Sequence, residues 1–341
     1  MDIFTPKERL LRALKKEGVE RPPVICPGGM MNAAIVDIMK KTGNSLPAGH
    51  HSSDLMSQLA LDVQQNTGFE NFGIPFCMTV EAEVLGSEID YGTLECEPKI
   101  QKEKFAGSDL VVFVPSGSIA KAKRAQAVID SLYRLSEKYP DIPAIGSLTG
   151  PMSTAGSIVD PMTFLKQLRR DKEASHRLLD YVCGHLIEYA QLMADNGASV
   201  ISIADPTATG EILGPKMFEE YAVPYLNKVT DAIHTMCLPV IIHICGEMKM
   251  VTAQIARLHG DAISVDAFVS LKKIKEEIGN VTTMGNLSTY LLEFGNPDGV
   301  RNSTEKLLRD KIDIIAPACG LSTSTPLSNI KAFTQTVTET K

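Results

Sequence analysis

The chain has 341 residues, of which 44% are hydrophobic and 22% charged, a composition that suffices for a large buried core in an ordinary globular fold. Its formal net charge of −7, without any run of lysine or arginine, argues against nucleic acid as a partner. No uncharged run approaches the roughly 18 residues that span a bilayer, and residues 1–10 lack the apolar core of a signal peptide, so we expect no membrane association and a cytoplasmic location. The seven cysteines show no framework spacing and are expected to be reduced.

The first predicted element is an amphipathic helix over residues 6–15. Thr5 is the expected N-cap, and Pro6 suits the first helical position, where its missing N–H costs nothing. Further along, residues 81–140 are longer than a βα unit needs, and residues 81–107 within them contain alternating stretches. We therefore predict a small hairpin insertion there, followed by a helix over residues 119–139.

Short runs rich in valine and isoleucine alternate with longer amphipathic stretches, which is typical of a parallel sheet built from βα units. The predicted strands are residues 22–26, 73–80, 142–148, 199–205, 239–245, 262–267, 281–287 and 313–319. Predicted helices between the later strands are residues 173–196, 215–236, 248–259, 271–278 and 299–309. Eight such strands predict an α/β fold of the (β/α)8 TIM-barrel type, as a single domain over residues 1–341, with an N-terminal helical extension and a small insertion after the second strand. A doubly wound sheet is the alternative, and the close, regular spacing of the later strands favours the barrel.

Two soft metal ligands, His243 and Cys245, close the apolar strand at residues 239–245. Side chains two apart on a strand share one face, and histidine with cysteine is a ligand set that zinc selects. Another apolar strand, residues 313–319, also ends in Cys-Gly, which makes Cys319 the candidate third ligand. The remaining cysteines are expected to be small core residues, and the remaining histidines to be solvated, with the pair His50 and His51 the least certain.

Three protein ligands with a fourth position open are typical of a catalytic zinc. Two thiolates and a neutral imidazole make the site formally neutral, so it activates water poorly and instead suits a thiol substrate, which zinc would hold as a nucleophilic thiolate. The residues therefore predict thiol alkylation.

Other strand ends carry residues with two possible roles each. Asp266 either takes the fourth metal position or accepts the thiol proton, or else it orients His243. Asp205 either holds substrate or caps the turn that follows it. Gly28 and Gly29 do not form a phosphate loop, and we expect them to leave room for something large to approach the mouth of the barrel. Glu81 and Glu83 lie either near a strand end or within the insertion.

Several segments resemble the uroporphyrinogen decarboxylase superfamily, and within it the zinc-dependent methylcobamide:coenzyme M methyltransferases of methanogens. The resemblance covers essentially the whole chain, and its most specific part is His-Ile-Cys-Gly at residues 243–246 with a distant Cys-Gly at 319–320. The other matching segments are residues 5–10, 21–26, 149–152 and 205–207. In place of the arginines expected near the first strand of the decarboxylases, this chain has Pro-Gly-Gly-Met-Met at residues 27–31, which disfavours decarboxylation.

The resemblance implies an enzyme that moves a methyl group from methyl-Co(III), carried on a partner corrinoid protein, to the thiol of coenzyme M. It places the zinc ligands at His243, Cys245 and Cys319, and the corrinoid near Gly28 and Gly29. Ser322 and Thr323, together with Ser324, are the expected donors to the sulfonate of coenzyme M. The alternatives are a methyltransferase with another thiol acceptor, such as homocysteine, and a non-enzymatic corrinoid- or metal-binding accessory protein.

Overall fold

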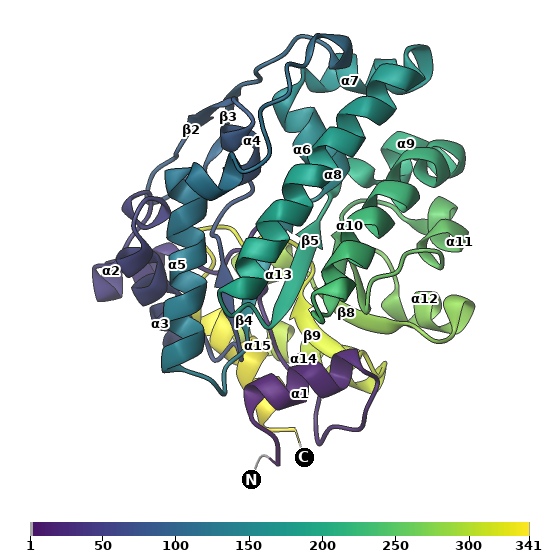
Figure 1. Cartoon of the computed structure of the whole chain (residues 1–341). Helices are drawn as coiled ribbons and strands as arrows, with labels where there is room; N and C mark the ends of the chain where they lie inside the picture. The colour runs from purple at the N-terminus through teal and green to yellow at the C-terminus, as the bar shows by residue number, and fades with distance from the viewer. Residues whose placement is uncertain (1–2, 341) are drawn as a thin grey trace.

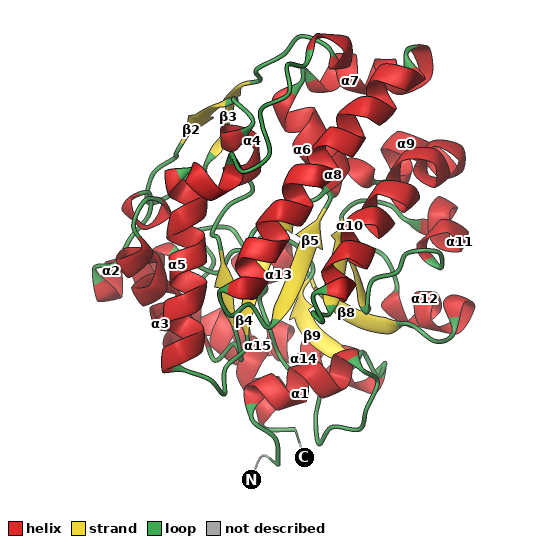
Figure 2. Ribbon diagram, in the orientation of Figure 1, coloured by secondary structure: helices red, strands yellow, loops and turns green. Residues whose placement is uncertain are grey.

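A parallel β-sheet surrounded by helices forms the centre of the protein, in a computed structural model that describes residues 3–340 (Figures 1 and 2). The strands, in their order across the sheet, are β1 (Phe72–Ile74), β4 (Ala144–Thr149), β5 (Val200–Ala204), β6 (Val240–Ile244), β7 (Ala262–Val265), β8 (Thr282–Leu287) and β9 (Ile314–Pro317). All neighbouring strands in this sheet are parallel. Every residue of β4, β5 and β6 is buried, because helices cover the outside of the sheet and the strands curl around their own core.

The predicted first strand is reduced to a single bridge between Val24 and Ile315 of β9. Ile25 N donates to Ile315 O at 2.9 Å, and Ile315 N donates to Pro23 O at 2.8 Å. The segment 23–26 therefore lies beside the last strand of the sheet, where the first strand of a barrel is expected.

Side chains replace a backbone ladder between this segment and the region just before β1. Glu70 N donates to Val24 O, while Glu70 Oε2 accepts from Val24 N, both at 2.9 Å. The Asn71 amide bonds both backbone groups of Cys26, again at 2.9 Å. The buried polar groups of the segment are thus satisfied on both sides, although only one bridge is regular.

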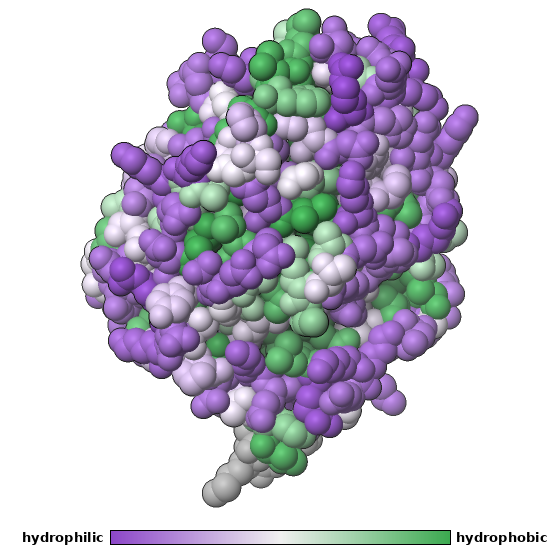
Figure 3. Space-filling model, viewed as in Figure 1, coloured by the Kyte–Doolittle hydropathy of each residue, from purple (hydrophilic) through white to green (hydrophobic). Residues whose placement is uncertain are grey.

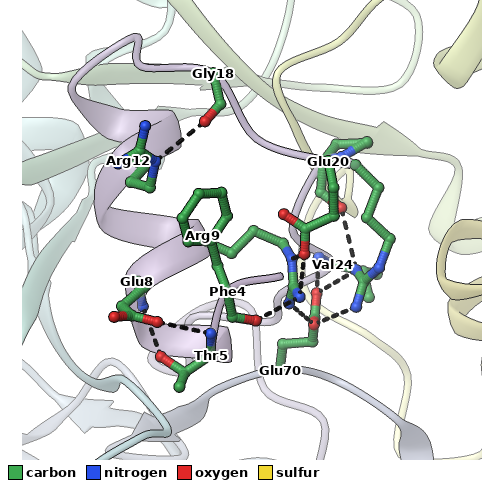
Figure 4. A network of polar contacts seen from close by, with 11 residues as sticks. Phe4, Thr5, Glu8, Arg9, Arg12, Gly18, Glu20, Val24 and Glu70 are labelled. Carbon is green, nitrogen blue, oxygen red and sulfur yellow. Dashed lines mark hydrogen bonds and ion pairs between the residues drawn. The ribbon is translucent and has the colours of Figure 1, made fainter. Parts of the chain in front are cut away.

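The buried carboxylate of Glu70 also connects this edge to the N-terminal helix, α1 (Pro6–Leu14). It accepts hydrogen bonds from Arg9 and Arg21, and Arg9 also donates to Glu20 (Figure 4). Arg9 is fully buried, so its charge is stabilised by these two carboxylates. The network holds α1 across the end of the sheet from which the strands start (Figure 1).

The α-helices that follow α1 are distributed along the rest of the described chain. They are α2 (Val36–Thr42), α3 (Ser53–Thr67), α4 (Val80–Val84), α5 (Lys123–Lys138), α6 (Pro151–Ile158), α7 (Pro161–Arg170), α8 (Lys172–Asp195), α9 (Gly210–Met217), α10 (Val223–Thr235), α11 (Thr252–Ile255), α12 (Leu271–Ile278), α13 (Thr289–Phe294), α14 (Pro297–Arg309) and α15 (Leu327–Thr338). A π-helix, Phe218–Ala222, joins α9 to α10. The insertion after β1 contains an antiparallel hairpin, β2 (Glu88–Asp90) and β3 (Lys99–Lys102).

Several predicted elements are confirmed, and two more differ from the prediction besides the first strand. Thr5 caps α1 in a capping box with Glu8, and the hairpin insertion and the helix α5 are present. The predicted strand 73–80 ends at Ile74, because Pro75 has no N–H for a ladder and the chain then turns into α4. The predicted helix 248–259 contains only a 3-10 turn, Lys249–Val251, and the single turn of α11.

Between residues 3 and 340, no helix combines the length and apolar character that crossing a membrane requires. The face seen in Figure 3 is mainly hydrophilic, with separate apolar patches. The observed architecture agrees with the predicted α/β class and with a barrel-like curl of the parallel sheet.

Candidate metal centre

His243, Cys245 and Cys319 come together at the ends of two strands that are not neighbours. His243 lies in β6, and Cys245 is the first residue after that strand. Cys319 follows β9, and two strands, β7 and β8, lie between β6 and β9 in the sheet. The His243 Nε2 atom lies 2.9 Å from Cys245 Sγ, which lies 3.2 Å from Cys319 Sγ. All three ligand atoms lie within 4.8 Å of one another, so one metal ion can reach them all. This contact also shows that the sheet curls far enough to bring β6 and β9 together at their carboxyl ends.

A serine on the neighbouring strand orients His243. Ser264 of β7 is paired in register with His243, and its Oγ lies 2.9 Å from His243 Nδ1. Both residues are fully buried. When a metal ion binds Nε2, Nδ1 carries the proton and donates to Ser264 Oγ, which fixes the tautomer and the ring plane. Of the roles that the sequence left open for Asp266, orienting His243 does not hold: the hydroxyl of Ser264, two residues earlier, contacts His243 Nδ1 instead.

The sulfur atoms of Cys245 and Cys319 lie within hydrogen-bonding distance of each other. The hydrogen bond from Cys245, with a smaller contribution from His243, lowers the pKa of Cys319. The same hydrogen bond, together with burial, raises the pKa of Cys245. The pair therefore holds one negative charge readily and resists a second until a cation joins it.

Asp266 lies beside the centre but outside the ligand group. Its carboxylate accepts from Ala267 N at 2.6 Å and from Gly246 N at 3.5 Å. Its backbone oxygen accepts from the side chain of Asn286 at 2.7 Å, which anchors the loop after β7. Among the described residues the compact metal-ligand group contains no carboxylate, so this geometry argues against Asp266 as the fourth ligand. Its role as proton acceptor stays a prediction.

The carboxylate of Asp205 accepts hydrogen bonds from the first turn of α6. Its fully buried carboxylate accepts from Met152 N at 3.0 Å, from Ser153 N at 2.8 Å and from Ser153 Oγ at 2.7 Å. Burial raises the pKa of Asp205 to about 6, against the opposing effect of these hydrogen bonds. Gly150 is required beside it, because a Cβ there would lie 2.4 Å from Asp205 Cβ. The carboxylate thus satisfies the N-terminus of α6, a different segment from the following turn that the sequence suggested.

Gly28 and Gly29 are packed against the chain itself. Both have positive φ angles, of 90° and 58°. A Cβ on Gly28 would lie 2.4 Å from Gly73 C in β1, and one on Gly29 would lie 2.7 Å from Ser147 Cβ in β4. The expectation that the two glycines leave open space is wrong: their missing side chains allow a tight turn to contact two strands.

Ser322 and Thr323 already have partners. Ser322 Oγ donates to Glu293 Oε1 at 2.7 Å, and Thr323 Oγ1 donates to the backbone oxygen of Glu95, near the hairpin, at 2.8 Å. The hydroxyl of Ser324 also donates to Glu293. A carboxylate at the centre of this cluster repels a sulfonate, so the geometry argues against this predicted site.

The acidic residues after β1 lie in α4 rather than in the hairpin. Glu81 is buried, accepts from Thr149 N and Oγ1, and has its pKa raised by burial. Glu83 pairs with the buried guanidinium of Arg124 at 2.6 Å. These carboxylates fasten α4 to β4 and to α5.

Met30 is a neighbour of the centre that the sequence did not single out. Its Sδ atom lies 3.7 Å from Cys245 Sγ. Met30 follows the two glycines of the tight turn. Its sulfur atom was the only feature of the sequence that could have pointed to the metal centre, and methionine side chains usually pack in a hydrophobic core.

Comparison with known proteins gives a consistent result. The profile of the Uroporphyrinogen decarboxylase (URO-D) family matches residues 5–340. A methylcobamide:CoM methyltransferase, MtbA, of Methanosarcina acetivorans is 32% identical over 337 residues, which cover 98% of each chain. A methylcobamide:CoM methyltransferase, MtaA, of Methanosarcina barkeri is 30% identical, over 98% of this chain and 97% of the relative. A solved structure of a methyltransferase from Methanosarcina mazei superposes with a TM-score of 0.91 at 31% identity, covering 98% of this chain and 99% of that one.

Proposed function

The chain belongs to the uroporphyrinogen decarboxylase family, and we propose that it is a methyltransferase that moves a methyl group from a methylated corrinoid to the thiol of coenzyme M. The observation that carries the proposal is the group of His243, Cys245 and Cys319 at one end of the sheet. Relatives named methylcobamide:CoM methyltransferases, at 30–33% identity over 98% of the chain, supply the donor and the acceptor.

Zinc is the metal whose preferences fit these residues. One imidazole nitrogen and two sulfurs, with the outer imidazole nitrogen held by Ser264, match the ligand types and the supporting hydrogen bond of zinc sites. Bound there, zinc would lower the pKa of an added thiol and hold it as a thiolate. The three protein ligands leave one position for that thiol.

The transfer itself needs only one bond to form and one to break. The thiolate sulfur attacks the methyl carbon, the S–C bond forms, and the Co–C bond breaks with both electrons left on cobalt as Co(I). The thiol proton must leave before the attack, and we propose that Asp266 accepts it, because its carboxylate contacts Gly246 N, next to Cys245.

The same proposal extends to the molecule as a whole. We infer that residues 1–341 act as a single domain, and that the segment around Val24 completes an eight-stranded barrel whose open end faces the corrinoid. We further propose that a corrinoid protein delivers the methyl group and that the reaction takes place in the cytoplasm.

The absorbance of methylcobalamin tests the proposal. The zinc-loaded protein is mixed anaerobically with methylcobalamin and either coenzyme M or homocysteine. We expect the methyl-Co(III) spectrum to disappear with coenzyme M and to persist with homocysteine. Loss with homocysteine alone would reassign the acceptor. No loss with either thiol, even when a methylated corrinoid protein replaces the free cofactor, would indicate an accessory protein.

A further inference from the structure

We propose that the thioether sulfur of Met30 occupies the fourth position of the metal centre at rest and that the substrate thiol displaces it. This inference rests on the proposed function, because it concerns the position that the thiol enters. It assigns a role to a residue that lies more than two hundred positions from the other ligands in the chain.

The distance from the Met30 sulfur to Cys245 agrees with tetrahedral coordination. Zinc–sulfur bonds of about 2.3 Å in a tetrahedron place two sulfur ligands about 3.8 Å apart. Met30 Sδ lies 3.7 Å from Cys245 Sγ. The thioether therefore already stands at a ligand-to-ligand distance from one of the thiolates.

A rigid turn holds Met30 in this place. Gly28 N donates to Met31 O at 3.1 Å, and Met31 N donates to Gly28 O at 2.9 Å, which closes the turn. Gly29, at φ 58°, fits against β4. On the other side, a Cβ on Gly320 would lie 2.6 Å from Met30 O, so the residue after Cys319 must be this small for the turn to approach. Three glycines thus bring Met30 against Cys245, an arrangement that a purely apolar core contact does not need.

The nearby carboxylates have other partners. Asp266 accepts from two backbone N–H groups, and Glu97 accepts from Asn32 Nδ2 at 3.3 Å. Neither belongs to the compact ligand group that the described residues form. The thioether therefore has no competitor of this kind at the fourth position.

A thioether suits a position that must be vacated. It is neutral, so the resting centre with two thiolates stays neutral, and it is a weaker donor than a thiolate. It also excludes water until the substrate arrives. In the exchange the bond from zinc to Met30 Sδ would break, the bond to the substrate sulfur would form, and the thiol proton would pass to the Asp266 carboxylate; no atom is oxidised or reduced.

X-ray absorption at the zinc K edge tests the assignment on the zinc-loaded full chain. For the resting wild type we expect three sulfur and one nitrogen neighbours. Met30→Leu, which keeps the volume but removes the sulfur, should show two sulfur and two nitrogen or oxygen neighbours. Met250→Leu is the matched control, since Met250 is 62% exposed in the 3-10 turn after β6, and it should give the wild-type spectrum. With coenzyme M added, all three proteins should show three sulfurs.

The wild-type measurement alone can overturn the assignment, whatever Met30→Leu does to folding. Two sulfurs in the resting wild type, or an unchanged spectrum in a folded Met30→Leu protein, would refute the role of Met30. If coenzyme M nevertheless raises the count from two to three, the proposed function survives that refutation. If coenzyme M adds no sulfur to Met30→Leu, the proposed function itself fails.

Discussion

The hydrogen bond from His243 to Ser264 gives the sharpest quantitative prediction. Ser264→Ala removes the acceptor for His243 Nδ1–H, and both residues are fully buried, so no solvent replaces it. Removing such a partner of a metal-bound histidine typically weakens the metal 10- to 100-fold, about 1.4–2.7 kcal/mol. An unpaired buried donor costs about 1–3 kcal/mol, which agrees with that range. We therefore expect the zinc Kd of Ser264→Ala to rise by one to two orders of magnitude.

Competition with a chromophoric zinc chelator at fixed pH measures this change. Ser202→Ala is the control, because Ser202 is a buried serine of β5, two strands away from Ser264, and should keep the wild-type zinc Kd. A zinc Kd for Ser264→Ala within twofold of the wild type would refute the idea that this hydroxyl orients the histidine.

Four further changes test other parts of the account. Cys319→Ala should abolish tight zinc binding and methyl transfer together with little change in Tm, as metal analysis and thermal unfolding would reveal; full activity without zinc would contradict it. Asp266→Asn should retain zinc yet slow methyl transfer several-fold if Asp266 accepts the thiol proton, and unchanged rates would assign it a structural role. Burial, and to a smaller extent the charge of Arg124, lowers the pKa of His50 to about 3. Between about pH 6.5 and pH 3 the unfolded chain therefore binds a proton at His50 that the folded chain does not bind, so the unfolding free energy falls as the pH drops through this range. Between pH 6 and pH 4, the unfolding free energy measured in urea titrations should therefore fall by about 2 kcal/mol less in His50→Leu than in the wild type. Parallel pH profiles of the two proteins would exclude His50 as a cause of acid destabilisation. Glu70→Gln should lower the unfolding free energy by about 3–5 kcal/mol in guanidinium titrations, since buried arginine charges lose their carboxylate, and a loss under 1 kcal/mol would be inconsistent with the network.

The later strands and the metal ligands were predictable because each depends on local pattern. Apolar runs such as β6 are buried on both sides, and their periodicity and length identify them without knowledge of their neighbours. His243 and Cys245 share a face through strand geometry alone. Cys319 was found because its strand ends in the same Cys-Gly pair.

Features that depend on contacts between distant segments were not predictable. The pairing of Ser264 with His243 requires the register of β6 against β7, and nothing in either strand states that register. The sequence of residues 22–26 has the pattern of a strand, but the segment forms almost no backbone ladder. The side chains of Glu70 and Asn71 hold it in place instead, and the sequence does not indicate these contacts. Gly28 appeared to make room, and only its contact with β1 shows that the chain fills the space itself.

The central claim is that zinc on His243, Cys245 and Cys319 activates the accepting thiol, and zinc titration tests it directly. Zinc is added stepwise to metal-free protein, and the rate of methyl-coenzyme M formation from methylcobalamin is measured at each step. The account predicts a rate that rises in proportion to bound zinc and levels off at one zinc per chain. Metal-free protein that transfers methyl groups as fast as zinc-loaded protein would contradict it.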